Sequence, residues 1–294
     1  PSYGMQGTRI YSTTVGSSYK KEVIRKQDLI PAGNPADNMQ YDSLHVKFTG
    51  GEEQVQIHRI IHTTGGMKDM FNSMSRMQYQ YFRDESTAIN TIGKLSKLQQ
   101  FHQDYLIEIV DKEKEGELKA GKEIVKLWLE DMNGISDPQD LTLSVLSVGR
   151  SEENPALRFS MDFSTGDILG EAGDHLIVDM EKLLGKFAEF SEQEKERNVD
   201  VYMPCPRVLK WYIALDIPEG YSVSNAGVFN GSLANSTGSF ECNATVEGSK
   251  LIVEAAKTYN HDYEPLANWP ELLAMLEYSH TLSKQKLVLS KTGN

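Results

Sequence analysis

The chain has 294 residues, of which 39% are hydrophobic and 24% are charged, and its formal net charge at pH 7 is -12. These proportions are typical of a globular protein with one large domain or two ordinary ones. An acidic chain is repelled by phosphate backbones and anionic lipids, which disfavours nucleic-acid and membrane-surface binding. No window approaches the ~18 consecutive apolar residues that span a bilayer. We expect further sequence upstream of Pro1, because proline does not start translation.

The first part of the chain predicts an extended lead-in and then a hairpin. Residues 1–35 are polar and rich in Gly, Ser, Thr and Pro, which favours a linker with one strand near Glu22–Ile30. From 41 to 64, apolar and polar residues alternate on both sides of a Gly-Gly turn. His58 and His62 fall on the polar face and lack the glutamate of a zinc-binding helix, so exposed histidines are favoured over a metal site.

Helical periodicity replaces this alternation over about 66–132, which predicts a helical insertion. Its first part carries methionines at helical spacing, a pattern more typical of core than of a partner surface; these are Met67, Met70, Met74 and Met77. Two further helical stretches are expected at about 87–107 and 112–132.

From residue 138 onward the pattern is mostly that of β-strands. The clearest strand places alternate residues on one apolar face; these are Leu209, Trp211, Ile213, Leu215 and Ile217. Strands at 240–246 and 250–257 flank a hairpin turn.

Two helices and a last strand complete the expected elements. A short helix is expected around Glu181–Phe187. Pro270 opens a longer helix, with Asn268 as its cap. A final strand is expected at 287–289.

These elements together predict a mainly β protein of the α+β class. We expect an antiparallel β-sandwich or super-sandwich with helices packed on one side, because amphipathic helices need a sheet against which to bury their apolar stripes. The sandwich region is expected to form one unit over 36–291 after the lead-in at 1–35. An alternative division places a domain boundary near residue 136.

The two cysteines, Cys205 and Cys242, each fall on the apolar face of a predicted strand. This placement favours buried thiols that act as small hydrophobes, and a disulfide between neighbouring strands stays open as an alternative. A catalytic thiol is disfavoured, because apolar surroundings raise the thiol pKa. No Ser-His-Asp or Cys-His-Asp set has a supporting spacing, so we predict no catalytic residue, no metal site and no cofactor.

Short motifs in the last 120 residues follow one another in a characteristic order, and they include Gly173-Asp174-His175, Leu183-Leu184-Gly185, Met203 to Arg207, Ile217 to Tyr221, Thr258-Tyr259 and Asn268-Trp269-Pro270. In this order they resemble the C-terminal region of transglutaminase-like proteins common in Bacteroidetes. The resemblance implies a papain-like catalytic core upstream of Pro1 and a β-rich domain at the end of the chain. The nucleophilic Cys of that family, with its His and Asp, would precede Pro1, so no residue here inherits those roles. The resemblance also implies a periplasmic or cell-surface location.

Two functions are expected from these observations. The first is a non-catalytic accessory or scaffold region whose partner is the upstream transglutaminase-like domain of the same polypeptide. The alternative is a stand-alone module that binds a glycan or a peptide, with Tyr212, Tyr221 and Tyr259 as exposed aromatic platforms. An independent hydrolase is a third hypothesis.

Overall fold

The computed structural model describes residues 5–14, 21–30, 33–49, 53–69, 71, 112, 115–116, 118–149 and 153–292. The chain divides into two compact units, Pro1–Asn34 and Pro35–Asn294. In the first unit, β1 (Met5–Thr14) pairs antiparallel with β2 (Lys21–Ile30). The sequence predicted only the second of these strands, because β1 is mostly polar and contains Gly7.

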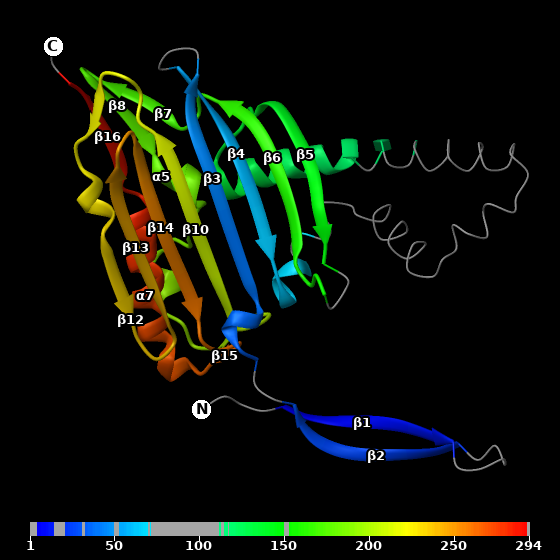
Figure 1. Ribbon diagram of the computed structural model, residues 1–294. Helices are drawn as coiled ribbons and strands as arrows, with labels where there is room; N and C mark the ends of the chain where they lie inside the picture. The colour runs from blue at the N-terminus through cyan, green and yellow to red at the C-terminus, as the bar shows by residue number, and fades with distance from the viewer. Residues whose placement is uncertain are drawn as a thin grey trace, which may run out of the picture. The chain divides into compact units, whose positions relative to one another are not determined.

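An eight-stranded sheet is the largest of the sheets that the structure describes in the second unit (Figure 1). Its strands, in spatial order, are β12 (Gly231–Ala234), β13 (Gly238–Glu247), β14 (Lys250–Tyr259), β10 (Arg207–Asp216), β3 (Met39–Thr49), β4 (Gln54–Thr63), β6 (Leu157–Thr165) and β5 (Gln139–Val148). Neighbouring strands are antiparallel except β10 and β3, which run parallel with Val208 opposite Met39. The sequence did not predict this parallel pair.

Smaller elements pack beside the large sheet. A four-stranded sheet has the order β11 (Tyr221–Val223), β16 (Lys286–Lys291), β8 (His175–Asp179) and β7 (Leu169–Ala172). The two-residue strands β9 (Val201–Tyr202) and β15 (Tyr263–Glu264) pair with each other. Short 3₁₀ helices lie at Pro35–Asp37, Gly65–Met67, Ala226–Phe229 and Leu266–Asn268.

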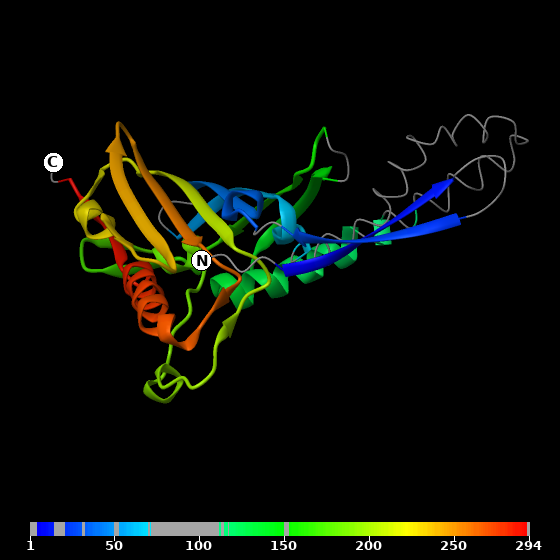
Figure 2. The same cartoon turned by 90° about the horizontal axis from the view of Figure 1, so that it is seen from below.

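The described α-helices include residues 118–128, α5 (Met180–Leu184), α6 (Glu192–Lys195) and α7 (Trp269–Ser283). The first of these continues into a π-helical turn at Leu129–Asn133. Figure 2 shows this helix and α7 on the same side of the large sheet. Within the described ranges, no helix combines the length and the apolar character needed to cross a membrane.

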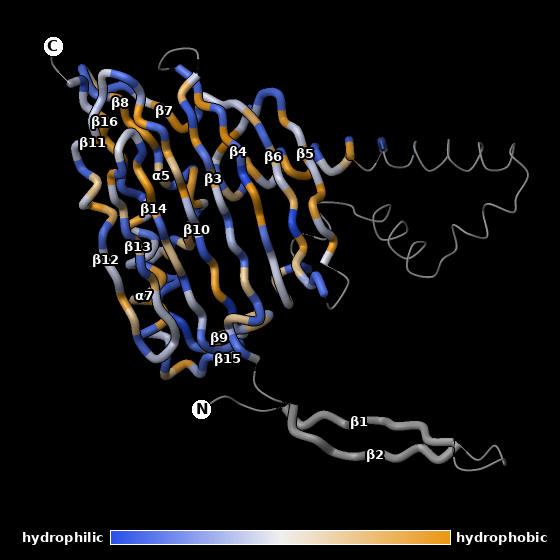
Figure 3. The backbone as a smooth tube through the Cα atoms, viewed as in Figure 1, coloured by the Kyte–Doolittle hydropathy of each residue, from blue (hydrophilic) through white to orange (hydrophobic). Residues whose placement is uncertain are grey.

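Alternation along the strands determines which side chains enter the core. In β10, Trp211, Ile213 and Leu215 are at most 6% exposed, as predicted, while Lys210 and Tyr212 have the opposite parity and face the open side. Hydropathy accordingly alternates along neighbouring strands (Figure 3). The four-stranded sheet, α5 and α7 contribute to the same hydrophobic core as the large sheet. The predicted α+β sandwich with helices on one side is therefore confirmed.

Several expected elements are present, with two corrections. The helix α5 and the hairpins β3–β4 and β13–β14 lie where the sequence placed them. Asn268 occupies the position before α7, but its side chain makes no capping bond, since its backbone is helical rather than extended; its amide donates to Glu264 Oε2 at 2.7 Å. The strand expected around the first cysteine is only two residues long, Val201–Tyr202.

The helical insertion can be compared with the structure only in part. Met67 is buried, at 3% exposure, and residues 118–128 are helical, as expected. The predictions for Met70, Met74, Met77 and the stretch 87–107 lie outside the described residues.

Gly238 lies where no side chain fits, between β14 and α7. A Cβ atom there would lie 2.0 Å from the Thr258 carbonyl oxygen and 3.0 Å from Met275 Sδ. We therefore expect Gly238→Ala to lower the free energy of unfolding by about 1–3 kcal/mol, measured by urea denaturation. Gly227→Ala is the control, because no heavy atom lies within 4 Å of that Cβ position. Equal unfolding midpoints for the two variants would contradict the close packing.

Candidate functional site

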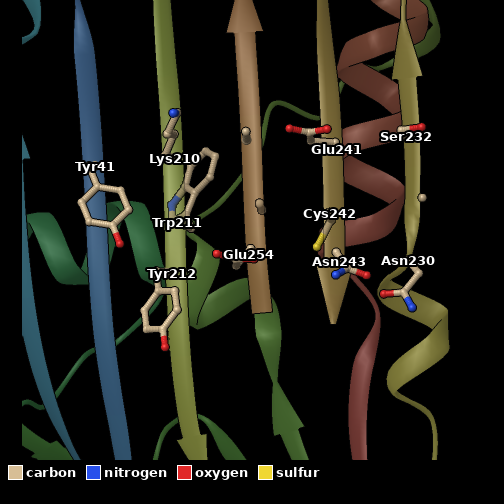
Figure 4. Close-up of a pocket in the computed structure, with 13 residues that line it drawn as sticks. Tyr41, Lys210, Trp211, Tyr212, Asn230, Ser232, Glu241, Cys242, Asn243 and Glu254 are labelled. Carbon is tan, nitrogen blue, oxygen red and sulfur yellow. The ribbon is translucent and has the colours of Figure 1, made fainter. Parts of the chain in front are cut away.

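A groove of about 570 Å³ lies on the open face of the large sheet, over β3, β10, β14 and β13 (Figure 4). Side chains that alternate away from the core line it; these are Tyr41, Lys210, Tyr212, Glu241, Asn243 and Glu254, with Asn230 and Ser232 at the β12 side. Trp211 and Cys242 also border the groove, but both are buried on the opposite face. Their backbone therefore forms part of its floor.

Two tyrosine rings on neighbouring strands form the aromatic part of the groove. In the parallel register, Tyr41 lies opposite Lys210 and Ser43 lies opposite Tyr212, so the two rings are diagonal neighbours on one face. Both residues are half-buried, and Figure 4 shows their hydroxyl groups pointing in the same direction. Burial raises the pKa of Tyr41, and the nearby Tyr212 and Glu254 raise it further. Its phenol is therefore neutral and able to donate a hydrogen bond at neutral pH.

Polar side chains extend the groove toward the edge of the sheet. Glu254 on β14 lies opposite Tyr212 on one side and Asn243 on the other. In the next row, Lys210 and Glu241 both lie opposite Ala256. The groove thus places amine, amide and carboxylate groups around two rings, a combination that can satisfy a ligand with many hydroxyl groups.

The structure separates the three tyrosines that the sequence singled out. Tyr212 lies in the groove, while Tyr221 is half-buried in β11, where Lys291 Nζ lies 5.7 Å from its ring centroid. Tyr259 is only 8% exposed, so the expectation of an exposed ring is wrong for this residue. Its position in β14 places it on the core face, where Arg207 Cζ lies 4.2 Å from the centre of its ring.

Tyr41 completes the groove and was not predicted. The alternation of β3 could have placed it on the polar face, because Leu44 and Val46 have the opposite parity. Its position beside Tyr212 depends on the parallel pairing, for which the local pattern carries no signal.

Both cysteines are free thiols in environments that oppose ionisation. Cys242 is buried, and desolvation raises its pKa to about 12. Burial also raises the pKa of Cys205. Since the thiolate is the nucleophilic form, neither residue has the environment of a catalytic cysteine.

The two histidines of β4 lie on the open face, outside the groove. His58 Nδ1 lies 2.7 Å from Asp162 Oδ1. Burial, with the neighbouring Arg158, lowers the pKa of His62. Across the described parts of the chain, no cluster of three or more His, Cys, Asp or Glu residues is arranged to hold a metal ion.

Comparison with known families matches residues 176–289 to the domain of unknown function with a solved structure, DUF3858. No curated protein and no solved structure matches the chain. The matched segment runs from β8 into β16 and includes β10, β13 and β14 of the groove, whereas Tyr41 lies outside it. Residues 176–289 are therefore similar to the DUF3858 family, which has no assigned function.

Proposed function

We propose that this chain is a non-catalytic binding module whose open-face groove holds a neutral glycan. The observation that carries the proposal is the pair of adjacent rings, Tyr41 and Tyr212, beside Lys210, Glu254 and Asn243. A sugar ring has an apolar C–H face that can pack on an aromatic ring, and a rim of hydroxyl groups that can bond to the polar side chains.

The position of the groove within the sheet favours a glycan over a peptide. Peptides that add to a sheet use the unpaired backbone of an edge strand. The strands β3, β10, β14 and β13 are each paired on both sides, so they offer no such edge. Glu241 and Glu254 disfavour an anionic ligand, which makes a neutral saccharide the better fit.

Two alanine variants test the glycan site. A glycan array should give a ligand, and calorimetry should show binding weakened about 10-fold, or ~1.4 kcal/mol, by Tyr212→Ala and by Tyr41→Ala. Tyr202→Ala is the matched control, because Tyr202 is 77% exposed and lies outside the groove. Equal affinities for all three variants would contradict the groove, and a peptide-array signal without any glycan signal would favour the peptide alternative.

The resemblance supports a further proposal about where this module works. We infer that it is an accessory region of a transglutaminase-like protein, at the periplasm or cell surface, which presents substrate to an upstream catalytic domain. The motif order over about 170–291 supports this role. The sequence encoded before residue 1 tests the proposal: a papain-like core with Cys, His and Asp would support it, and an unrelated domain would contradict it.

A further inference from the structure

We infer that the chain has a second binding site, for a small monocarboxylate with an apolar body, in a cavity on the inner side of the large sheet. The cavity has a volume of about 360 Å³ and lies between β10 and the segments that contain the π-helical turn and the residues after α5. This inference does not depend on the proposed glycan groove, which lies on the opposite face. The strand β10 contributes to both sites, with Leu209 facing inward and Lys210 outward.

The walls of the cavity are mainly apolar and aromatic. They include Trp128, Met132, Phe187, Leu209 and Trp211. The Phe187 and Trp211 ring centroids lie 5.4 Å apart. Trp211 is 6% exposed, whereas Met132 is 40% exposed, so the cavity has a buried wall and a solvent-accessible rim. Its volume lies at the lower end of the ~300–1,000 Å³ that is typical of small-molecule sites.

The charges that line the cavity are all positive. Its described lining residues include Arg59, Lys186 and Arg207 but no aspartate or glutamate. Asp42 neutralises Arg59 through a buried ion pair. Lys186 is exposed and donates to the Glu130 carbonyl oxygen at 3.2 Å.

Arg207 is the half-buried lining cation for which the described residues provide no countercharge. It donates to the Cys205 carbonyl oxygen at 3.3 Å and stacks over Tyr259. Among the residues that the structure describes, no carboxylate forms an ion pair with it. Its remaining N–H groups are suited to bind a carboxylate through two parallel hydrogen bonds.

A second cation without a countercharge lies behind the cavity wall. Lys257 is 2% exposed, and its Nζ donates to Ser279 Oγ at 2.7 Å and lies 4.7 Å from the centre of the Phe187 ring. Burial, with the nearby Arg207, lowers the pKa of this lysine to about 7. A buried cation with only a neutral hydrogen-bond partner is costly. An anion in the cavity would supply countercharge to both residues, and the apolar walls would pack against the rest of the ligand.

Phenylacetate and its neutral amide test the charge requirement. We expect phenylacetate to bind the full chain in calorimetry and to change the fluorescence of Trp128 and Trp211. Phenylacetamide should bind at least about 10-fold more weakly, because it cannot provide the negative charge. Equal binding of the two compounds, or no binding of phenylacetate at about 10 mM, would overturn the proposal.

The Arg207→Gln variant tests the position of the carboxylate. We expect it to weaken phenylacetate binding about 10-fold or more, since the neutral glutamine cannot form the charge-assisted hydrogen bonds of the guanidinium. Arg158→Gln is the matched control, because Arg158 is an exposed arginine outside the cavity lining. An unchanged affinity in folded Arg207→Gln would overturn the assignment. If this variant does not fold, the comparison of acid and amide in the unaltered protein decides the question.

Discussion

Replacing Asp42 by alanine is expected to lower the free energy of unfolding by about 3–5 kcal/mol, because it leaves a buried cation without its partner. Asp42 is 0% exposed and Arg59 is 2% exposed. Arg59 Nε donates to the two Asp42 carboxylate oxygens at 2.9 Å and 3.1 Å. Without Asp42, the described partners of the guanidinium are Asn133 Oδ1 at 3.1 Å and the Trp128 ring at 4.5 Å. Urea denaturation followed by circular dichroism measures the loss.

Two further variants identify the cause of this loss. The double variant Asp42→Ala with Arg59→Met should recover much of the stability, because it removes both buried charges. Asp162→Ala should cost less than about 1 kcal/mol, since it breaks the exposed contact with His58. If Asp42→Ala is as stable as Asp162→Ala, the buried pair does not have the expected role.

Replacing Lys257 by methionine is expected to stabilise the protein at low pH and to remove one source of pH dependence. The pKa of this lysine falls from 10.5 to about 7 on folding, chiefly because of burial. Between these two values the unfolded chain holds a proton that the folded chain has released, so the stability contributed by this group rises with pH. Below about pH 7 both states are protonated and the full cost of burial applies. That cost is on the order of 5 kcal/mol.

The difference in the free energy of unfolding between the Lys257→Met variant and the unaltered protein isolates the contribution of Lys257. Urea denaturation at about pH 6 should show the methionine variant more stable by several kcal/mol, and the gap should narrow toward about pH 10. Lys210→Met provides the control, because Lys210 is exposed on the open face. A gap that stays constant over this pH range would show that Lys257 does not titrate as expected. A stabilising replacement would also fit a cation retained for ligand binding at the expense of stability.

Local alternation predicted much of the fold, because the direction of a strand side chain depends only on its parity. It placed Trp211 inward and Tyr212 outward in β10, and both positions are confirmed. The same reasoning applied to β14 would have placed Tyr259 and Lys257 inward with Ala255. Those two residues were missed because their polar groups suggested exposure more strongly than their parity suggested burial.

The neighbours of each strand could not be predicted in the same way. Tyr41 and Tyr212 meet only because β3 and β10 pair in parallel, and hydrophobic patterns do not specify which strands become neighbours. The inner cavity has the same origin, since its lining comes from β10, a helical segment and loops that are far apart in the chain. The sequence therefore predicted which face of a single strand is buried. Both candidate sites, however, depend on contacts between segments that are distant in the chain.

The parallel pairing of β3 with β10 also has a consequence for biosynthesis. The hairpin of β3 and β4 leaves the ribosome long before β10, which must later pair with the open edge of β3 along Val208 to Leu215. Until then, that edge presents unpaired backbone groups, which is the usual starting point for aggregation of nascent chains. Closing such a long-range contact is also slow. We therefore expect slower translation, or chaperones that protect exposed strand edges, to increase the yield of folded protein.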